Sequence, residues 1–270
     1  MKLTTKIILG FLLTVFITSL VLIIGFSFSD RTKFERNFIS DRISIPQEKT
    51  GIELPSFKTI VIEKTTDTKK LFPNDDCYIK FESAKEEHSA NILFIPEAMK
   101  DFVSVHSSDD TLKVKLDMDA LIAKFDNSDY PYSAISGVNM HFYTSKTDII
   151  QKIEWIPVII SNIETDSIKI RSRGTVNIVD CKAIVIDPLF DDRRLIIKNT
   201  EAKRVYIDMD HIPNWNFENC NIEEEYITGS KRYNMTYHKN EAKIIYWVPK
   251  EKDATLNIKI EGEPAKIIIQ

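Results

Sequence analysis

The C-terminal half of the chain repeats one short pattern of hydrophobic and polar positions. The four copies read VIISNI (158–163), VNIVDC (176–181), LIIKNT (195–200) and WNFENC (215–220). Spacings of 18, 19 and 20 residues separate their central apolar residues, which are Ile160, Ile178, Ile197 and Phe217. Short alternating runs that return with a period near 20 predict β-strands stacked as a solenoid.

A second apolar strand follows each copy of the pattern. These strands are SIKI (167–170), AIVI (183–186), RVYI (204–207) and EEYI (224–227), and further strand pairs continue to Gln270. One rung cannot bury its apolar face alone, so stacking joins the central apolar residues into a continuous column. We expect residues 151–270 to form roughly six rungs of an all-β, right-handed solenoid similar to a β-helix.

Two further positions of the repeat predict columns of their own. Asn and Asp favour turns, and side-chain amides about 4.8 Å apart along a stack can bond each other. The polar column therefore predicts corner reinforcement rather than a ligand-binding strip; its members are Asn162, Asp180, Asn199 and Asn219. In the next column Cys181 and Cys220 fall two rungs apart, about 9.6 Å, which exceeds the reach of a disulfide. We expect both cysteines to be reduced and buried.

An uncharged segment of 23 residues, Ile7–Ser29, lies near the N-terminus. About 20 apolar residues span a bilayer, whereas a signal-peptide core has about 7–15. We therefore expect residues 1–29 to be an uncleaved transmembrane signal-anchor, with cleavage after Ser27-Phe28-Ser29 as the alternative. Residues 30–54 are polar without periodicity and predict a tether. Basic residues after the span favour a cytoplasmic body, but the strand-rich body favours export to the periplasm or cell surface, which we expect.

The composition excludes several classes of function. The net charge is −4, and basic residues are interspersed with acidic ones, so no basic face for nucleic acid is expected. Seven glycines form no phosphate-binding loop. Three cysteines without a CxxC pair and five histidines without metal-ligand spacing predict no metal site and no cofactor. No GxSxG motif is present.

Residues 55–150 are also rich in strand patterns, and their order resembles a known family. PSFKTIVIEK (55–64) precedes CYIKFES (77–83), ILFIP (92–96) and the hairpin segment DDTLKV (109–114), after which the rungs begin. This order resembles the auto-transporter adhesin head domain, or GIN domain, family of Bacteroidetes, here as a membrane-anchored member. The resemblance implies an exported β-solenoid with no established catalytic residues. Two features depart from the family: Asp110 replaces a turn glycine, and an insertion at 119–134 predicts a helical turn and a loop.

The best acidic candidates follow from the repeat. Asp187 and Asp208 each end the second strand of neighbouring rungs, and Asp210 and His211 lie in the adjoining loop. Carboxylates stacked about 5 Å apart can bind Ca²⁺ or act as a glycosidase pair. The alternative interpretation is a set of solvated turn acids balanced by neighbouring arginines, and we favour it because charged turns are common.

Two W-x-P segments, WIP (155–157) and WVP (247–249), and a group of tyrosines form the main aromatic features. Exposed aromatic rows can stack on sugars. Aromatic residues more often cap the open edges of a solenoid, so we expect capping here.

These observations predict a non-enzymatic, membrane-anchored, exported binding or adhesin-like protein of the cell envelope. Its expected partners are the membrane, through the N-terminal helix, and a glycan or another envelope protein. One alternative is a carbohydrate-active β-helix enzyme that uses Asp187 and Asp208. The other is a purely structural envelope component.

Overall fold

The computed structural model describes residues 14–16, 18–19, 42–65, 70–73, 76–83, 91–125, 132–144, 148–154, 156–190, 194–262 and 264–270. The chain divides into two compact units, residues 1–42 and 43–270. Of the predicted span Ile7–Ser29, only five residues are described, and these are helical. No helix in the described part of the chain is both long and apolar enough to cross a membrane.

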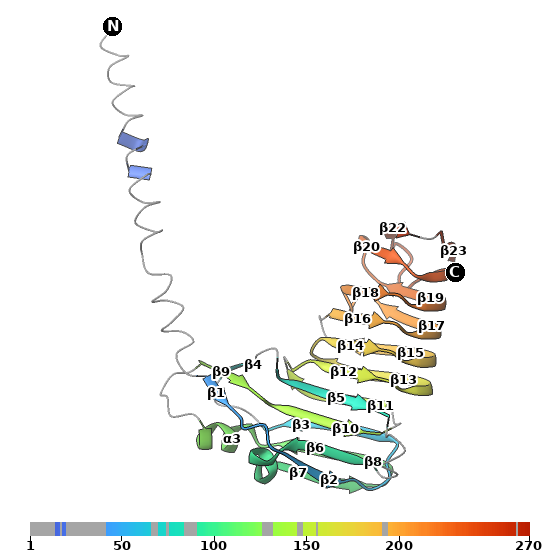
Figure 1. Cartoon of the computed structure of the whole chain (residues 1–270). Coiled ribbons are helices and arrows are strands. Elements are labelled where there is room, and N and C mark those ends of the chain that lie inside the picture. The colour runs from blue at the N-terminus through green and yellow to red at the C-terminus, as the bar shows by residue number, and fades with distance from the viewer. Residues whose placement is uncertain are drawn as a thin grey trace. The chain divides into compact units, whose positions relative to one another are not determined.

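Two large β-sheets form the body of the second unit and face each other across its core (Figure 1). The eight-stranded sheet has the order β18 (Asn214–Glu218), β16 (Arg194–Lys198), β14 (Val176–Val179), β12 (Val158–Ser161), β5 (Tyr78–Glu82), β10 (Asn139–Tyr143), β6 (Ile92–Pro96), β2 (Lys49–Glu53). The ten-stranded sheet has the order β23 (Lys266–Ile269), β21 (Ala242–Pro249), β19 (Asn221–Gly229), β17 (Glu201–Asp208), β15 (Lys182–Phe190), β13 (Glu164–Arg173), β11 (Asp148–Glu154), β3 (Thr59–Lys64), β8 (Thr111–Leu116), β7 (Val103–Ser108).

Smaller elements complete the unit. Two small sheets are formed by β1 (Arg42–Ser44), β9 (Tyr132–Ser136) and β4 (Lys70–Pro73), and by β20 (Asn234–Asn240) with β22 (Leu256–Gly262). A 3-10 helix, η1 (Glu97–Phe102), packs against β2, β6 and β7, and α3 (Met118–Phe125) packs against η1. The predicted helical turn of the insertion is α3, and Asp117 begins it by accepting the Ala120 N–H at 3.0 Å.

The register confirms the predicted stack. Ile160 pairs with Ile178, Ile178 with Ile197, and Ile197 with Phe217, all between parallel strands. All four side chains are at most 1% exposed. The predicted solenoid is therefore present, with about six turns. Because every rung has the same alternation of apolar and polar residues, side chains about 20 positions apart in the sequence lie in contact on neighbouring rungs.

The polar column forms the corner of each rung, as predicted. The φ angles are 54° at Asn162, 54° at Asp180, 47° at Asn199 and 55° at Asn219, so each residue adopts the left-handed conformation that Asn and Asp tolerate best. The Asn199 amide donates to Asp180 at 3.0 Å, and the Asn219 amide donates to Asn199 at 3.4 Å. In the β7–β8 hairpin the left-handed residue is Asp109, at φ 52°, rather than Asp110.

The cysteine column also has the expected register. Lys182, Glu201 and Asn221 occupy successive rungs, so Cys181 and Cys220, one position earlier, lie two rungs apart. Both thiols are free. Cys181 is buried as expected, but Cys220 is only half-buried, so the expectation of burial is wrong for Cys220. The Cys220 N–H donates to the Glu241 carboxylate.

Two expected boundaries differ from the structure. The sequence predicts a tether over residues 30–54, yet Ile43 and Ile45 are buried and β2 pairs antiparallel with β6. The alternating pattern there is too short to stand out in the sequence. Residues 55–150 and 151–270 also share both large sheets and one continuous core, because β3 and β5 pair directly with β11 and β12.

Candidate binding site

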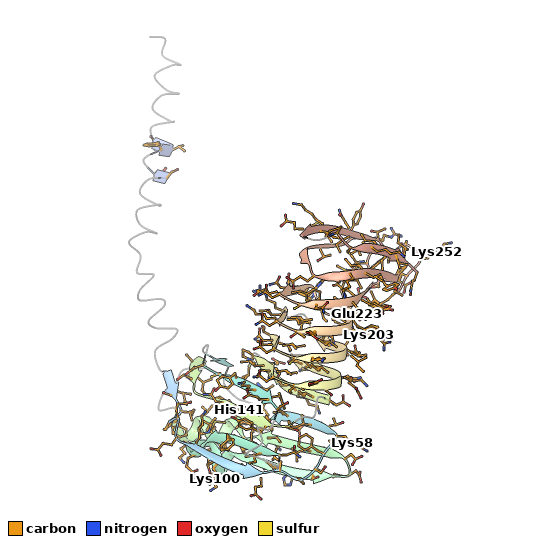
Figure 2. The ribbon with its side chains drawn as sticks, turned by 45° about the vertical axis from the view of Figure 1, so that its right-hand side comes forward. Lys58, Lys100, His141, Lys203, Glu223 and Lys252 are labelled. Carbon is orange, nitrogen blue, oxygen red and sulfur yellow. The ribbon has the colours of Figure 1, made fainter. Side chains whose placement is uncertain are left out.

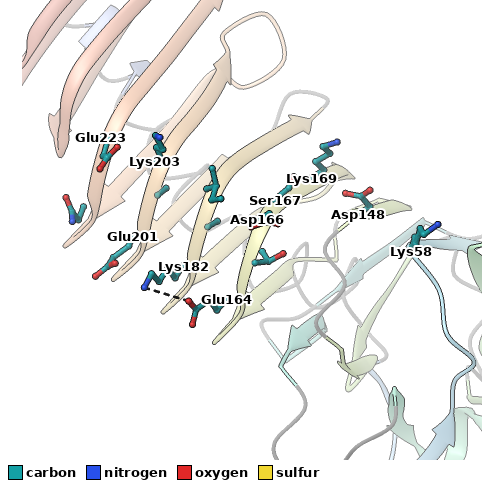
Figure 3. Close-up of a pocket in the computed structure, with 15 residues that line it drawn as sticks. Lys58, Asp148, Glu164, Asp166, Ser167, Lys169, Lys182, Glu201, Lys203 and Glu223 are labelled. Carbon is teal, nitrogen blue, oxygen red and sulfur yellow. Dashed lines mark ion pairs between the residues drawn. The ribbon is translucent and has the colours of Figure 1, made fainter.

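A groove of about 940 Å³ crosses the outer face of the ten-stranded sheet. The first residues of β13, β15, β17 and β19 line most of it, and Lys58 and Asp148 close one side (Figure 3). Each of these strands begins directly after a left-handed corner, which places its first residues at the same level. The repeat thus turns four separate strand starts into one continuous surface.

Charges alternate along the rungs of this surface. One column runs Glu164, Lys182, Glu201, and Lys182 lies 3.7 Å from Glu164. Parallel columns place Asp148 beside Lys169, and Lys203 level with Glu223. Opposite charges on neighbouring strands attract weakly at such exposed positions, so the alternation supports the stack without fixing the side chains.

The groove is nearly neutral as a whole. Its fifteen described residues include four lysines and five acids, which leaves a formal charge of −1. None of the fifteen is aromatic, and the apolar ones are Ala183, Ile184 and Ala202. A surface of regularly spaced donors and acceptors suits a partner of mixed charge better than a simple anion or cation.

Three of the four sequence-predicted site residues meet at a corner beyond β17. The Lys250 ammonium lies 2.6 Å from both carboxylate oxygens of Asp208 and 3.0 Å from Asp210. The Ser230 hydroxyl and N–H donate to Asp210, and His211 Nε2 lies 3.9 Å from Asp208.

The positive charge of Lys250 offsets the negative charges of the two carboxylates at this corner. Desolvation opposes ionisation of Asp210, but the hydrogen bonds from Ser230 and Lys250 outweigh it and lower its pKa. Desolvation also opposes the charge of Lys250, yet its bonds to Asp208 and Asp210 raise its pKa. A lysine therefore takes the place between the carboxylates where a cation would otherwise bind. Within the described residues, no group of three or more metal-binding side chains is present.

Asp187, the fourth predicted site residue, lies elsewhere. It is exposed within β15 and pairs with Lys169, which lines the groove. Because Ile186 pairs with Val205, Asp187 is level with Tyr206 and not with Asp208. The expected stacking of Asp187 on Asp208 is wrong, since β15 and β17 start in register but Asp187 is the sixth residue of β15 and Asp208 the eighth of β17.

A tyrosine ladder was missed in the sequence. Tyr206 stacks on Tyr226 with centroids 5.0 Å apart, and Tyr226 stacks on Tyr246 at 4.6 Å. Successive tyrosines of this ladder are 20 residues apart in the sequence, and this spacing could have predicted the stacking. Rings that stack on one another present their edges to solvent, so the ladder provides little flat surface for a sugar. The expected aromatic cap is also wrong for Trp247, which is buried between Ile227 and Ile269.

A second polar cluster lies on the eight-stranded sheet around Glu82, next to His141 (Figure 2). The Glu82 carboxylate is 3.0 Å from Lys80, 3.1 Å from His141 and 2.8 Å from the Asn162 amide. Desolvation opposes ionisation of Glu82, but these hydrogen bonds lower its pKa. Burial, and then Lys80, lower the pKa of His141, which keeps it neutral at pH 7. About sixty residues separate Glu82 from His141, so no sequence pattern joined them.

One charged residue occupies the core itself. Glu225 is fully buried and stands in the column between Val205 and Ile245. The Trp215 indole donates to its carboxyl at 2.9 Å. Desolvation raises the pKa of Glu225 to about 8, against which the Trp215 bond acts weakly.

Comparison with known proteins gives a limited result. No family model and no curated protein matches the sequence. Three similar solved structures each cover 85% of this chain. A candidate adhesin from Parabacteroides distasonis is 9% identical with a TM-score of 0.44 and is covered to 100%. A candidate adhesin from Bacteroides fragilis is 12% identical with a TM-score of 0.43 and is covered to 99%. A candidate lipid-binding protein from Parabacteroides distasonis is 12% identical with a TM-score of 0.32 and is covered to 100%. Similarity at this level assigns no function to the chain.

Proposed function

We propose that this chain is a non-enzymatic, adhesin-like binding protein of the cell envelope, and that the charged groove on the ten-stranded sheet is its binding surface. The observation that supports the proposal is the alternation of charge across three consecutive strand starts, at Glu164, Lys182 and Glu201. Such a surface can align a mixed-charge partner in one register. The lack of aromatic rings among its fifteen described lining residues favours another envelope protein over a glycan.

The proposed location follows from the sequence. The uncharged segment Ile7–Ser29 is long enough for a signal-anchor. We propose that it holds the chain in the membrane and that the solenoid is exported, as a member of the GIN domain family would be. Protease protection of the solenoid in intact spheroplasts would contradict export.

The glycosidase alternative receives little support from the acids that suggested it. Asp187 and Asp208 lie in different columns, and Lys250 neutralises Asp208 and Asp210. A carboxylate that must act as a general acid needs a raised pKa, whereas the pKa of Asp210 is lowered.

A charge-reversal experiment tests the groove. The Lys182→Glu/Lys203→Glu variant changes the formal charge of the lining from −1 to −5. Lys113→Glu/Lys115→Glu on β8 makes the same change outside the groove and is the matched control. Binding of the full chain to a glycan array and to an envelope-protein fraction would be compared for all three proteins.

We expect the groove variant to lose at least tenfold in binding to envelope protein while the control keeps its binding. Equal loss in both variants, or none in either, would contradict the groove as the site. Binding to glycans alone, reduced by the groove variant, would contradict the preference for a protein partner.

A further inference from the structure

The tyrosine ladder has two ends of different chemistry. Tyr226 stacks on Tyr206 on one side and on Tyr246 on the other, so within the described residues each outer ring keeps one face without a stacked ring. The open face of Tyr246 is directed toward β23, where the paired residue is the apolar Ile268. The open face of Tyr206 is directed toward β15, where the residue at its level is Asp187. One end of the ladder therefore faces a carboxylate.

Asp187 and Tyr206 lie on the same side of the sheet. Ile186 and Val205, the last hydrogen-bonded pair of β15 and β17, are both fully buried, so the residues that follow them point outward. Both strands continue beyond this pair, but Pro188 has no N–H to donate between them. No pairing between these two described strands closes the sheet at the level of the carboxylate and the ring.

Neither group has a charged partner in the described part of the chain. The Asp187 carboxylate makes no side-chain hydrogen bond or ion pair there, although Lys169 is level with it on β13. Among the described residues no lysine or arginine lies over the Tyr206 ring, and the cation–π contacts found are those of Lys124. A free carboxylate beside an open aromatic face is an arrangement that attracts organic cations.

We propose that Asp187 and the open face of Tyr206 bind an arginine side chain of the groove's protein partner, an inference that rests on the function proposed above. A guanidinium is planar, stacks on aromatic rings and pairs with a carboxylate through two hydrogen bonds. Stacked on Tyr206, it takes the place of the next ring in the ladder, at the level of Asp187. An ammonium has no plane to stack, so arginine fits this site better than lysine.

The cation site adjoins the groove through Lys169. This residue lines the groove and pairs in register with Asp187, so a partner that lies in the groove can reach both (Figure 3). The groove's lysines suit acidic side chains of the same partner. Arg204, two positions before Tyr206, is level with Glu224, whose charge offsets it. The ligand class that both surfaces accept together is a polypeptide segment with acidic and arginine side chains.

The expected contribution of the cation site is small. At exposed positions a cation–π contact changes an affinity by about two- to fivefold, and an ion pair contributes no more. The site is therefore expected to select among partners rather than to hold one alone. Its signature is a preference for arginine over lysine at equal ligand charge.

Fluorescence anisotropy of labelled peptides tests this preference on the full chain in mild detergent. One peptide alternates glutamate with arginine and the other alternates glutamate with lysine. The wild type should bind the arginine peptide about threefold more tightly, and Asp187→Asn and Tyr206→Leu should each remove that preference. A wild type that binds both peptides equally, or that binds neither, would overturn the proposal.

Tyr246→Leu is the matched control. It removes the ring at the other end of the ladder and the same kind of contact with Tyr226, but its open face is level with Ile268 and not with an acid. This variant should keep the preference for arginine. Equal behaviour of the Tyr206 and Tyr246 variants would contradict the site, and circular dichroism of each variant checks folding.

The groove variant separates this inference from the function on which it rests. Lys182→Glu/Lys203→Glu should weaken the binding of both peptides and keep the preference for arginine. If it weakens neither peptide while Asp187→Asn removes the preference, the cation site is supported and the groove is contradicted. If it weakens both while Asp187→Asn keeps the preference, the cation site alone is contradicted.

Discussion

At the scale of single residues, Glu225 places a carboxyl group in a column where its neighbours on both sides are apolar. Isoleucine or valine occupies its position in neighbouring rungs, so the core must accommodate a carboxyl group. A carboxyl whose folded pKa is about 8 keeps its proton where the unfolded chain has already lost it.

This difference predicts a pH dependence of stability. Between the unfolded pKa near 4.5 and about 8 the folded state binds more protons, so the free energy of unfolding falls as pH rises through this window. The fall should be on the order of a few kcal/mol. Urea unfolding between pH 5 and 9 measures it. Glu225→Gln should remove most of the slope, while the exposed Glu223→Gln should leave it; a wild-type stability that rises over this range would refute the assignment.

The left-handed corners predict the effect of a second substitution. Asn199→Ala places a residue that disfavours φ near 47° at the corner and removes two side-chain hydrogen bonds. We expect it to destabilise the chain by about 1–3 kcal/mol. Asn199→Gly keeps the backbone relaxed and should cost less. Asn177→Ala, mid-strand in β14, is the control; an alanine variant as stable as the glycine variant would show that the corner is not strained.

At the scale of elements, the repeat predicted strands and their register but not the surface that they form. Central residues such as Ile178 and Ile197 are apolar in each of these rungs, so their column can be predicted from the spacing alone. The groove depends on exposed residues such as Lys182 and Glu223, which differ from rung to rung and follow no apolar pattern. The sequence misplaces Asp187 because the runs AIVI and RVYI, which precede the two aspartates, start at different distances from the corner: at the second residue of β15 and at the fourth of β17.

The tyrosine ladder predicts that stacking between strands contributes to stability. Tyr226→Ala removes both ring contacts, each worth about 0.5–1.5 kcal/mol, and should destabilise the chain by about 1–3 kcal/mol. Tyr226→Phe keeps the ring and should retain most of that stability. Thermal unfolding compares them with Tyr233→Ala, whose side chain is 90% exposed and should be neutral. Equal losses for Phe and Ala would assign the effect to the hydroxyl, which bonds Glu224.

At the scale of the whole molecule, the features that the sequence did not predict depend on contacts between segments that are far apart in the chain. β2 joins the eight-stranded sheet through β6, and the Glu82–His141 cluster joins β5 to β10. Neither pairing leaves a periodic signal, because each occurs only once. The proposed groove shares this property, because it arises only after the rungs are stacked.

Disulfide trapping on the groove face measures that stacking directly. Lys203 and Glu223 are exposed and level on adjacent rungs, whereas Lys203 and Lys243 are two rungs apart, about 9.6 Å. The structure predicts rapid oxidation of Lys203→Cys/Glu223→Cys to an intrachain disulfide and none for Lys203→Cys/Lys243→Cys, because a disulfide needs Cα atoms within about 7 Å. The opposite outcome would contradict the register from which the solenoid and its groove are both derived.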